Sequence, residues 1–355
     1  MVRREVIVKE LGFRGNVVSQ LMLSDQRIAI ESAMKSLLSK YASPLFRIME
    51  YQIGWVDEQA VPVDRPTEYP MLYSALCLAS CQSTGGLTAS MIPMAVALEF
   101  VDNFFQVHID VQEGRQERYN RSTVWWIWGP GQAINVGDAF HALARLSIMS
   151  TPKNEDLSYD PLVAVQMIDT ACLRMCQGIN IDLTYQERLD VSVDSYLSMV
   201  RDKVGALMGC SMGLGSLYSP VPSETVYKLS QIGEEFGIIS QICEDIQELW
   251  QARRSGYPVN SGLLNKRKTL PVAYVFEKGS IAQKRALGNI YFKRVLEPSD
   301  LLKIADILED AGGKQYAEKM VERILNDIFL KIKGLGISED GCLVIEKIAN
   351  SLSTS

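Results

Sequence analysis

The stretch that decides the fold is FGIISQICEDIQELW, residues 236–250. Its apolar residues recur at helical spacing from Phe236 onward, which predicts an amphipathic helix. Near its end stand Glu244, Asp245 and Glu248, and residues three and four apart share a face of a helix. Clustered carboxylates repel one another unless a cation offsets them, and hard oxygen ligands suit Mg²⁺. A solvated helix face would carry the same pattern, so this motif alone leaves both interpretations open.

A second acidic pair strengthens the metal interpretation. In ALEFVDNFFQVHIDVQE, residues 97–113, the apolar positions predict a helix that is buried on more than one side. Asp110 and Glu113 are three apart and share one face of it. Two such helices packed side by side would direct two acidic clusters into one cleft, where bound Mg²⁺ could neutralise the charge of a diphosphate.

The composition is that of a globular protein with a sizeable core. The chain has 355 residues, 47% of them hydrophobic and 22% charged. A net charge of -6 argues against nucleic acid as the main partner. No apolar run is long enough to span a membrane, and the N-terminal residues lack the apolar core of a signal peptide, so we expect a cytoplasmic protein. The seven cysteines lie mostly in apolar helical patterns and are expected to be buried free thiols, since no neighbouring histidine completes a zinc set.

Helical periodicity recurs almost throughout, and strand signals are scarce. The sequence therefore predicts an all-α fold in a single domain over 24–350, with an N-terminal segment over 1–23 and a disordered tail over 351–355. A loop is expected up to Pro70, and a second loop over 253–268. The predicted helices cover 24–48, 71–82, 88–111, 131–150, 159–177, 191–217, 223–251, 268–278, 281–292, 297–312 and 314–333.

A diphosphate site also needs cations, and arginine offers planar bidentate donors. Arg118 stands in a basic stretch after the first acidic pair, and Arg267 in the loop NKRKTLPVAY. Lys203 lies in a predicted helix whose apolar residues are mainly Leu, Val and Met. That lysine either extends to solvent or faces a polar cavity, and the sequence does not decide between the two.

In this order, these motifs resemble the all-trans prenyl diphosphate synthases of the isoprenoid synthase fold. The resemblance spans roughly residues 51–272 and implies a helical bundle around a central apolar cavity. The chain is similar to that family in the segments HIDVQEGRQERYNRSTVW (108–125), AINVGDAFHALA (133–144), GINIDL (178–183), YLSMVRDKVGAL (196–207), SQICEDIQE (240–248) and KRKTLP (266–271).

The resemblance implies Mg²⁺ as cofactor, three ions in the closed state. It assigns the metal and the catalysis to Asp110, Glu113, Glu244, Asp245 and Glu248. Ile109 stands where the first motif of the family opens with an aspartate, and this substitution is expected to weaken metal binding. The allylic diphosphate is assigned, by the same resemblance, to Arg118, Lys203, Gln241 and Arg267.

This chain differs further from the family at the second substrate site. Where the resemblance implies basic residues for isopentenyl diphosphate, this chain has Arg65-Pro66-Thr67-Glu68-Tyr69-Pro70, and Tyr119 replaces a second arginine. Each lost close contact costs on the order of a few kcal/mol at an effective dielectric constant near 20. We therefore expect the chain to hold one diphosphate but not two.

The leading hypothesis is a Mg²⁺-dependent terpene synthase. It would ionise a linear allylic diphosphate, farnesyl to geranylfarnesyl with geranylgeranyl as the best guess, and cyclise the carbocation in an apolar, aromatic-lined pocket. Phe104, Phe105 and His108 are the candidate pocket residues; the two phenylalanines could equally be ordinary core packing.

Two alternatives stay open. The chain could be a catalytically reduced subunit that regulates a prenyl diphosphate synthase, or a prenyltransferase to a non-isoprenoid acceptor. The partners expected are a prenyl diphosphate and, by resemblance, a second copy of the chain in a homodimer. No nucleic acid and no membrane span are expected.

Overall fold

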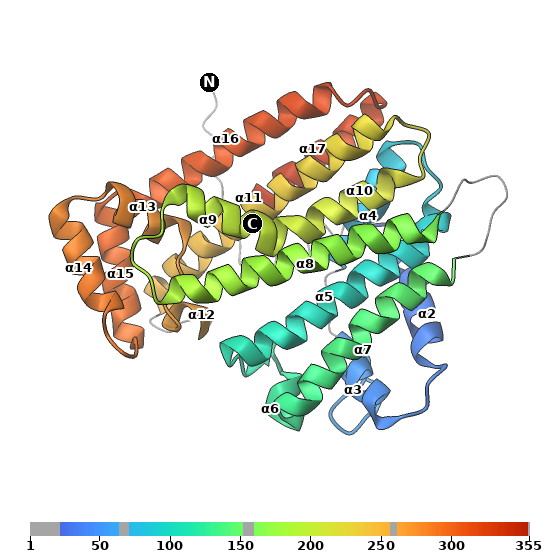
Figure 1. Cartoon of the computed structure of the whole chain (residues 1–355), viewed down its shortest axis with the longest axis horizontal. Coiled ribbons are helices and arrows are strands. Elements are labelled where there is room, and N and C mark those ends of the chain that lie inside the picture. The colour runs from blue at the N-terminus through green and yellow to red at the C-terminus, as the bar shows by residue number, and fades with distance from the viewer. Residues whose placement is uncertain (1–21, 64–70, 152–159, 256–260, 354–355) are drawn as a thin grey trace.

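A computed structural model describes residues 22–63, 71–151, 160–255 and 261–353 of the chain, and the side chains of these except 251–255 and 261–262. Nearly every described element is a helix, and the exception is one short hairpin, so the all-α prediction is confirmed. In Figure 1, α5 (Ile92–Glu113), α7 (Pro130–Met149), α8 (Pro161–Gln186) and α10 (Ala206–Leu217) run side by side across the molecule.

The other long helices pack around this group. The helix α11 (Ser223–Ser255) contacts α10 along its length, and α4 (Leu72–Ser83) packs on α5 and α10. The elements α13 to α15 form the end of the molecule away from α2 and α3 (Figure 1). The remaining helices are α2 (Ser24–Leu38), α3 (Pro44–Ile53), α6 (Val124–Trp128), α9 (Val193–Val200), α12 (Ser261–Leu264), α13 (Leu270–Lys278), α14 (Ile281–Tyr291), α15 (Pro298–Asp310), α16 (Gly313–Lys333) and α17 (Glu339–Ser353), with a 3₁₀ turn η1 (Thr88–Met91) and a π-helical turn η2 (Arg201–Gly205).

The core consists of three clusters of buried apolar side chains. One joins α5 and α7 and includes Phe100 and Phe140, whose ring centroids lie 5.7 Å apart. Another is centred on α11 and includes Phe236. The third lies under α13, α14 and α15 and includes Leu287. Burial of these side chains is the main source of stability, at about 25 cal/mol for each Å² of apolar surface removed from water.

Several predicted boundaries are wrong. The single helix predicted over 24–48 is two helices, because Pro44 disfavours a helical conformation at the residue before it and starts α3 itself. The loop predicted over 253–268 contains the end of α11 and the short α12. The tail predicted as disordered is helical up to Ser353, where Leu352 is fully buried; residues 354–355 lie outside the described part.

The hairpin was also not predicted. It joins β1 (Glu117–Arg118) to β2 (Arg121–Ser122), and its two turn residues, Tyr119 and Asn120, both have positive φ, +52° and +58°. Turns of this kind usually carry Asn-Gly or Asp-Gly, and that signal is missing here.

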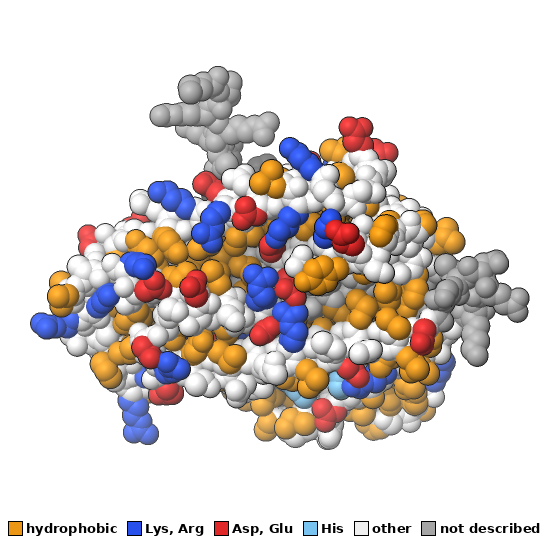
Figure 2. Space-filling view, turned by 45° about the horizontal axis from the view of Figure 1, so that its top comes forward, with side chains coloured by type: hydrophobic (Ala, Val, Ile, Leu, Met, Phe, Trp, Pro, Cys, Tyr) orange, Lys and Arg blue, Asp and Glu red, His pale blue; other side chains and the backbone are white. Residues whose placement is uncertain are grey.

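The surface carries both charged and apolar side chains. On the face drawn in Figure 2, hydrophobic side chains form broad patches between scattered lysines, arginines and carboxylates. All seven cysteines are free thiols. Five are buried as expected, whereas Cys176 is exposed and Cys342 is partly exposed. Among the described residues, no helix is long and apolar enough to cross a membrane.

Candidate active site

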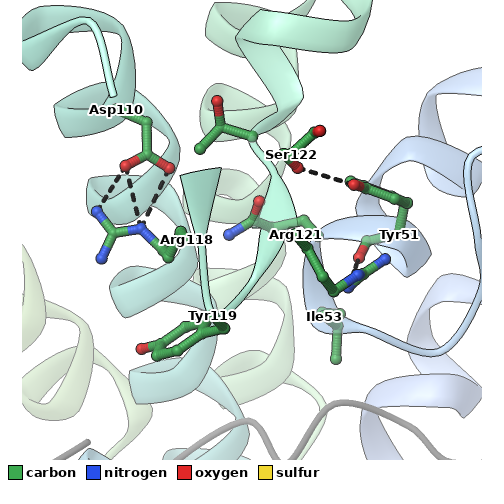
Figure 3. Close-up of a pocket in the computed structure, with 9 residues that line it drawn as sticks. Tyr51, Ile53, Asp110, Arg118, Tyr119, Arg121 and Ser122 are labelled. Atoms are coloured by element: carbon green, nitrogen blue, oxygen red, sulfur yellow. Dashed lines mark hydrogen bonds and ion pairs between the residues drawn. The ribbon is translucent and has the colours of Figure 1, made fainter. Parts of the chain in front are cut away.

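The first acidic motif stands at the C-terminal end of α5. Gly114, with φ +65°, ends the helix directly after Glu113, and the chain turns back through the hairpin. The hairpin returns Arg118 to the helix, where its Nε and Nη2 atoms lie 3.0 and 2.6 Å from Oδ1 of Asp110 (Figure 3). Burial raises the pKa of Asp110 from its usual value, and Arg118 opposes that shift. The aspartate of this motif is therefore already bound to an arginine.

Glu113 connects this helix end to two distant cations. Its carboxylate accepts a 2.6 Å hydrogen bond from Nη2 of Arg115. Burial alone would raise the pKa of Glu113. The charges of Arg115, and then of Lys203 and Arg267, outweigh burial and lower that pKa to about 2. The end of α5 thus shares an electrostatic environment with residues about 90 and 150 positions further along the chain.

Lys203 is directed inward by local backbone geometry. It lies in the π-helical turn η2, and such turns often occur at functional sites. At Gly178 of α8, a Cβ atom would come within 2.3 Å of the backbone nitrogen of Lys203, so only glycine permits this approach. The ammonium group then lies 2.5 Å from Oδ2 of Asp182, with 11% of the side chain exposed. Of the two alternatives for Lys203, the structure has the inward one.

Asp245, in the second acidic motif, is surrounded by donors. Its oxygens accept hydrogen bonds from the Tyr196 hydroxyl at 2.5 Å and from Gln241 Nε2 at 2.9 Å. The backbone N–H of Leu270 donates at 3.2 Å, and Nη2 of Arg267 at 3.4 Å. Burial nevertheless raises the pKa of Asp245 to about 6. With four donors, this carboxylate serves as an anchor for the elements around it.

Arg267 completes the group. Its Nη2 atom lies 2.5 Å from Oε2 of Glu248. Three buried polar atoms nearby in the fold have no hydrogen-bond partner among the described residues: Nε of Arg267, Oγ1 of Thr269 and Oδ1 of Asp182. Such atoms are costly unless a ligand or water satisfies them. We call Glu113, Asp182, Lys203, Asp245, Glu248 and Arg267 the charged cluster.

The donor chemistry of the two motifs fits Mg²⁺, but the arrangement differs from the prediction. Within the described ranges, no three His, Cys, Asp or Glu side chains gather closely enough to hold a metal ion. Asp110, Glu113, Asp245 and Glu248 all accept hydrogen bonds from protein donors, so a metal ion would have to compete with these donors for the carboxylate oxygens. The metal roles of all five acidic residues stay predictions.

A separate pocket lies between the hairpin and the end of α3 (Figure 3). Arg121, at its wall, donates to the carbonyl oxygens of Tyr51 and Val56 at 2.8 and 2.9 Å, and its guanidinium lies 4.1 Å from the Tyr51 ring centroid. The Tyr51 hydroxyl in turn donates to the carbonyl of Ser122. We call this the hairpin pocket; its lining residues are Tyr51, Gln52, Ile53, Asp110, Arg118, Tyr119, Arg121, Ser122 and Thr123.

The aromatic residues predicted to form the substrate pocket pack between helices. Phe104 stacks on His141 of α7 at 4.8 Å and meets His108 edge to face. Phe105 is 4% exposed and belongs to the core cluster of α5 and α7. Their role in shaping a substrate pocket stays a prediction. The segment 65–70, predicted to have lost the isopentenyl site, lies outside the described residues.

Sequence reasoning missed three residues of the site. Tyr196, which donates to Asp245, opens the segment 196–207 that resembles a family motif, but that match did not single it out. Asp182, the partner of Lys203, stands in the segment that resembles a family motif, so that match was a usable signal. Lys268, beside Arg267, is only 1% exposed, and nothing in a basic loop sequence indicates a buried lysine.

The comparisons with known proteins agree with the fold. A sequence model of the polyprenyl synthetase family matches residues 71–308. A geranylgeranyl diphosphate synthase of Mycobacterium tuberculosis is 28% identical over 322 residues, 89% of this chain and 90% of that protein. A (2E,6E)-farnesyl diphosphate synthase of Mycobacterium bovis is 27% identical over 307 residues, 85% of this chain and 84% of that protein. The crystal structure of a polyprenyl synthetase from Streptomyces coelicolor superposes with a TM-score of 0.82 at 26% identity, covering 94% of this chain and 99% of that one.

The helical bundle and its two acidic motifs define the class as the all-α isoprenoid synthases. Within that class, the chain belongs to the polyprenyl synthetase family. The predicted family and fold are confirmed, and the relatives carry out prenyl diphosphate synthesis by name.

Proposed function

We propose that this chain is an enzyme that binds one allylic prenyl diphosphate at the charged cluster, ionises it, and completes the reaction without a second diphosphate. The observation that carries the proposal is the hairpin pocket. Arg121 is committed to two backbone carbonyls. Arg118, the arginine predicted to bind the allylic diphosphate, also lines this pocket and is bound to Asp110. A phosphate would have to compete with these bonds, and Tyr119 supplies no replacement charge.

The charged cluster supports binding of the first diphosphate. Lys203 and Arg267 would bind its oxygens in competition with Asp182 and Glu248. Nε of Arg267 and Oγ1 of Thr269 are buried donors that a diphosphate oxygen could satisfy. The carboxylates of the two acidic motifs would hold Mg²⁺, which when bound neutralises the charge of a departing diphosphate. Gln241 and Tyr196 hold Asp245, and through it Arg267, in place.

With no second diphosphate, the carbocation is left to cyclise or to be captured by another nucleophile. We favour cyclisation, which makes the chain a terpene synthase, with a substrate between farnesyl and geranylfarnesyl diphosphate. Chain elongation is the second candidate, because the similar proteins named above are prenyl diphosphate synthases.

A homodimer is part of the proposal. The helices α7 and α8 leave large apolar side chains in solvent, among them Met149 at 56%, Leu162 at 64% and Leu173 at 67% exposed. Leu162 and Leu173 are eleven residues apart, three turns of helix, and so share one face of α8. A second copy of the chain would cover this surface.

The test is incubation of the purified protein with Mg²⁺ and each of geranyl, farnesyl, geranylgeranyl and geranylfarnesyl diphosphate, with and without isopentenyl diphosphate. A hydrocarbon or terpene alcohol from one substrate alone is the expected result. Longer diphosphates that form only with isopentenyl diphosphate would overturn the single-diphosphate proposal in favour of elongation. No turnover in any mixture would leave the two alternatives, a regulatory subunit or a prenyltransferase to a non-isoprenoid acceptor.

A further inference from the structure

A buried lysine holds the loop that carries Arg267. The side chain of Lys268 is 1% exposed, which is unusual for this residue type. Its Nζ atom donates to the backbone carbonyls of Gln186 and Lys266, both at 3.0 Å. It also lies 4.5 Å from the centroid of the Tyr291 ring. One ammonium group thus joins three segments that are far apart in the sequence.

Each of these partners suits a positive charge. Gln186 is the last residue of α8, where the unsatisfied carbonyls carry the negative end of the helix dipole. The face of the buried Tyr291 ring at the end of α14 attracts cations. The Lys266 carbonyl belongs to the loop itself. The charge therefore attaches the loop to the ends of two separate helices.

The loop adopts a backbone conformation that it would not favour alone. Lys266 has φ +63°, in the left-handed region that side chains other than glycine rarely occupy. The next residue, Arg267, enters the charged cluster and binds Glu248. Thr269 then precedes the first turn of α13. The strained turn and the buried arginine follow one another, so whatever fixes the turn also fixes the arginine.

We propose that Lys268 is a positioning residue whose ammonium group fixes the loop 265–268 and so holds Arg267 in place for the diphosphate. This inference rests on the proposed function, since it assumes that Arg267 meets a diphosphate at the charged cluster. Lys268 itself need not touch the ligand, because all of its contacts are to carbonyls and a ring on the protein.

Charged groups on every side of this lysine affect its pKa. Burial, and then the charge of Lys266 on the same loop, lower the pKa of Lys268 to about 8. Glu187, just after α8, and Asp182, within it, act in the opposite direction. Tyr291 faces the lysine as a neutral ring, since burial raises the pKa of its hydroxyl. Above pH 8 the amine would retain hydrogen bonds but lose its charge toward the α8 carbonyl and the ring.

The experiment measures binding of inorganic pyrophosphate with Mg²⁺ by calorimetry, in wild type and in Lys268→Met and Lys268→Arg variants. We expect about tenfold weaker binding for Lys268→Met at pH 7, the typical effect of losing one charge-assisted hydrogen bond. Lys268→Arg should restore most of the affinity, because it keeps the charge. Lys278→Met is the matched control, since Lys278 is exposed on α13 and pairs only with Glu277 among its described contacts.

A pH series gives a readout that a purely structural lysine would not change. Between pH 7 and 9, wild-type affinity should fall relative to Lys268→Arg and approach that of Lys268→Met, and the ratio cancels the titration of pyrophosphate itself. The comparison of wild type with Lys268→Arg needs no neutral substitution at this buried position. A constant ratio between wild type and Lys268→Arg would overturn the inference, as would a folded Lys268→Met protein with unchanged affinity. Absence of pyrophosphate binding in wild type would instead remove the proposed function on which the inference rests.

Discussion

The charged cluster and the hairpin pocket lie at the same end of α5 and use the same residue types differently. In the charged cluster, Arg267 binds Glu248 but keeps one buried donor, Nε, without a protein partner. In the hairpin pocket, Arg121 donates hydrogen bonds to backbone carbonyls at and just after the end of α3. The first arrangement retains capacity for a ligand, whereas the second stabilises the fold. Counting basic residues near a site therefore says little until their acceptors are known.

The largest effect that tests this difference is expected from Arg267→Met. It leaves Glu248 and Asp245 buried without their counter-charge, and removing one partner of a buried ion pair costs about 3–5 kcal/mol. Chemical denaturation should show a loss of that size in the free energy of unfolding, and calorimetry should show no binding of pyrophosphate with Mg²⁺. A variant that still bound pyrophosphate would remove Arg267 from the proposed diphosphate site.

The second effect concerns pH and Asp245. Because burial raises its pKa to about 6, against 3.8 in the unfolded chain, the folded protein holds a proton there that the unfolded chain releases. The stability contributed by this protonation is full below pH 3.8 and is lost as the pH rises through 6, a change of up to about 3 kcal/mol.

Asp245→Asn should abolish this part of the pH dependence while keeping the shape of the side chain. The measurement is the free energy of unfolding of both proteins from pH 4 to 7.5. Equal slopes would show that Asp245 titrates as it does in the unfolded chain, and the description of a desolvated anchor would be wrong.

Arg121→Met tests the other side of the comparison and should have a smaller effect. It removes two hydrogen bonds to the end of α3 and the contact with the Tyr51 ring, together about 2 kcal/mol of stability. Pyrophosphate affinity should stay at the wild-type value in calorimetry. If affinity fell as far as in Arg267→Met, both regions would belong to one diphosphate site.

The sequence predicted the parts of this site that depend on local periodicity. The acidic residues of α5 and α11 are on helices as expected, because three- and four-residue spacing determines a helix face. The pairing of Lys203 with Asp182 was not predictable, since it depends on a π-helical turn and on a glycine contact between two helices. The helix α17 was missed although Ile345, Ile348 and Leu352 follow a helical period.

The smallest effect, and the one that bears most on function, is expected from Tyr119→Arg. Tyr119 has φ +52° at the tip of the hairpin, a conformation equally unfavourable for tyrosine and arginine, so the exchange changes chemistry more than backbone strain. An added cation in the hairpin pocket should improve the affinity for isopentenyl diphosphate by about tenfold, the effect of one charged hydrogen bond. Larger gains are not expected, because the nearby carboxylates of Asp102 and Asp110 compete for the new charge.

Tyr119→Phe is the control for this exchange, because it removes the hydroxyl and adds no charge. Both variants are titrated with isopentenyl diphosphate when pyrophosphate and Mg²⁺ are already bound. The titration then reports binding at the hairpin pocket and not at the charged cluster. If Tyr119→Arg binds no better than Tyr119→Phe, the hairpin pocket is not where a second diphosphate would lie. If wild type already binds isopentenyl diphosphate as tightly as the arginine variant, the committed arginines do not exclude a second diphosphate, and chain elongation becomes the better account of this enzyme.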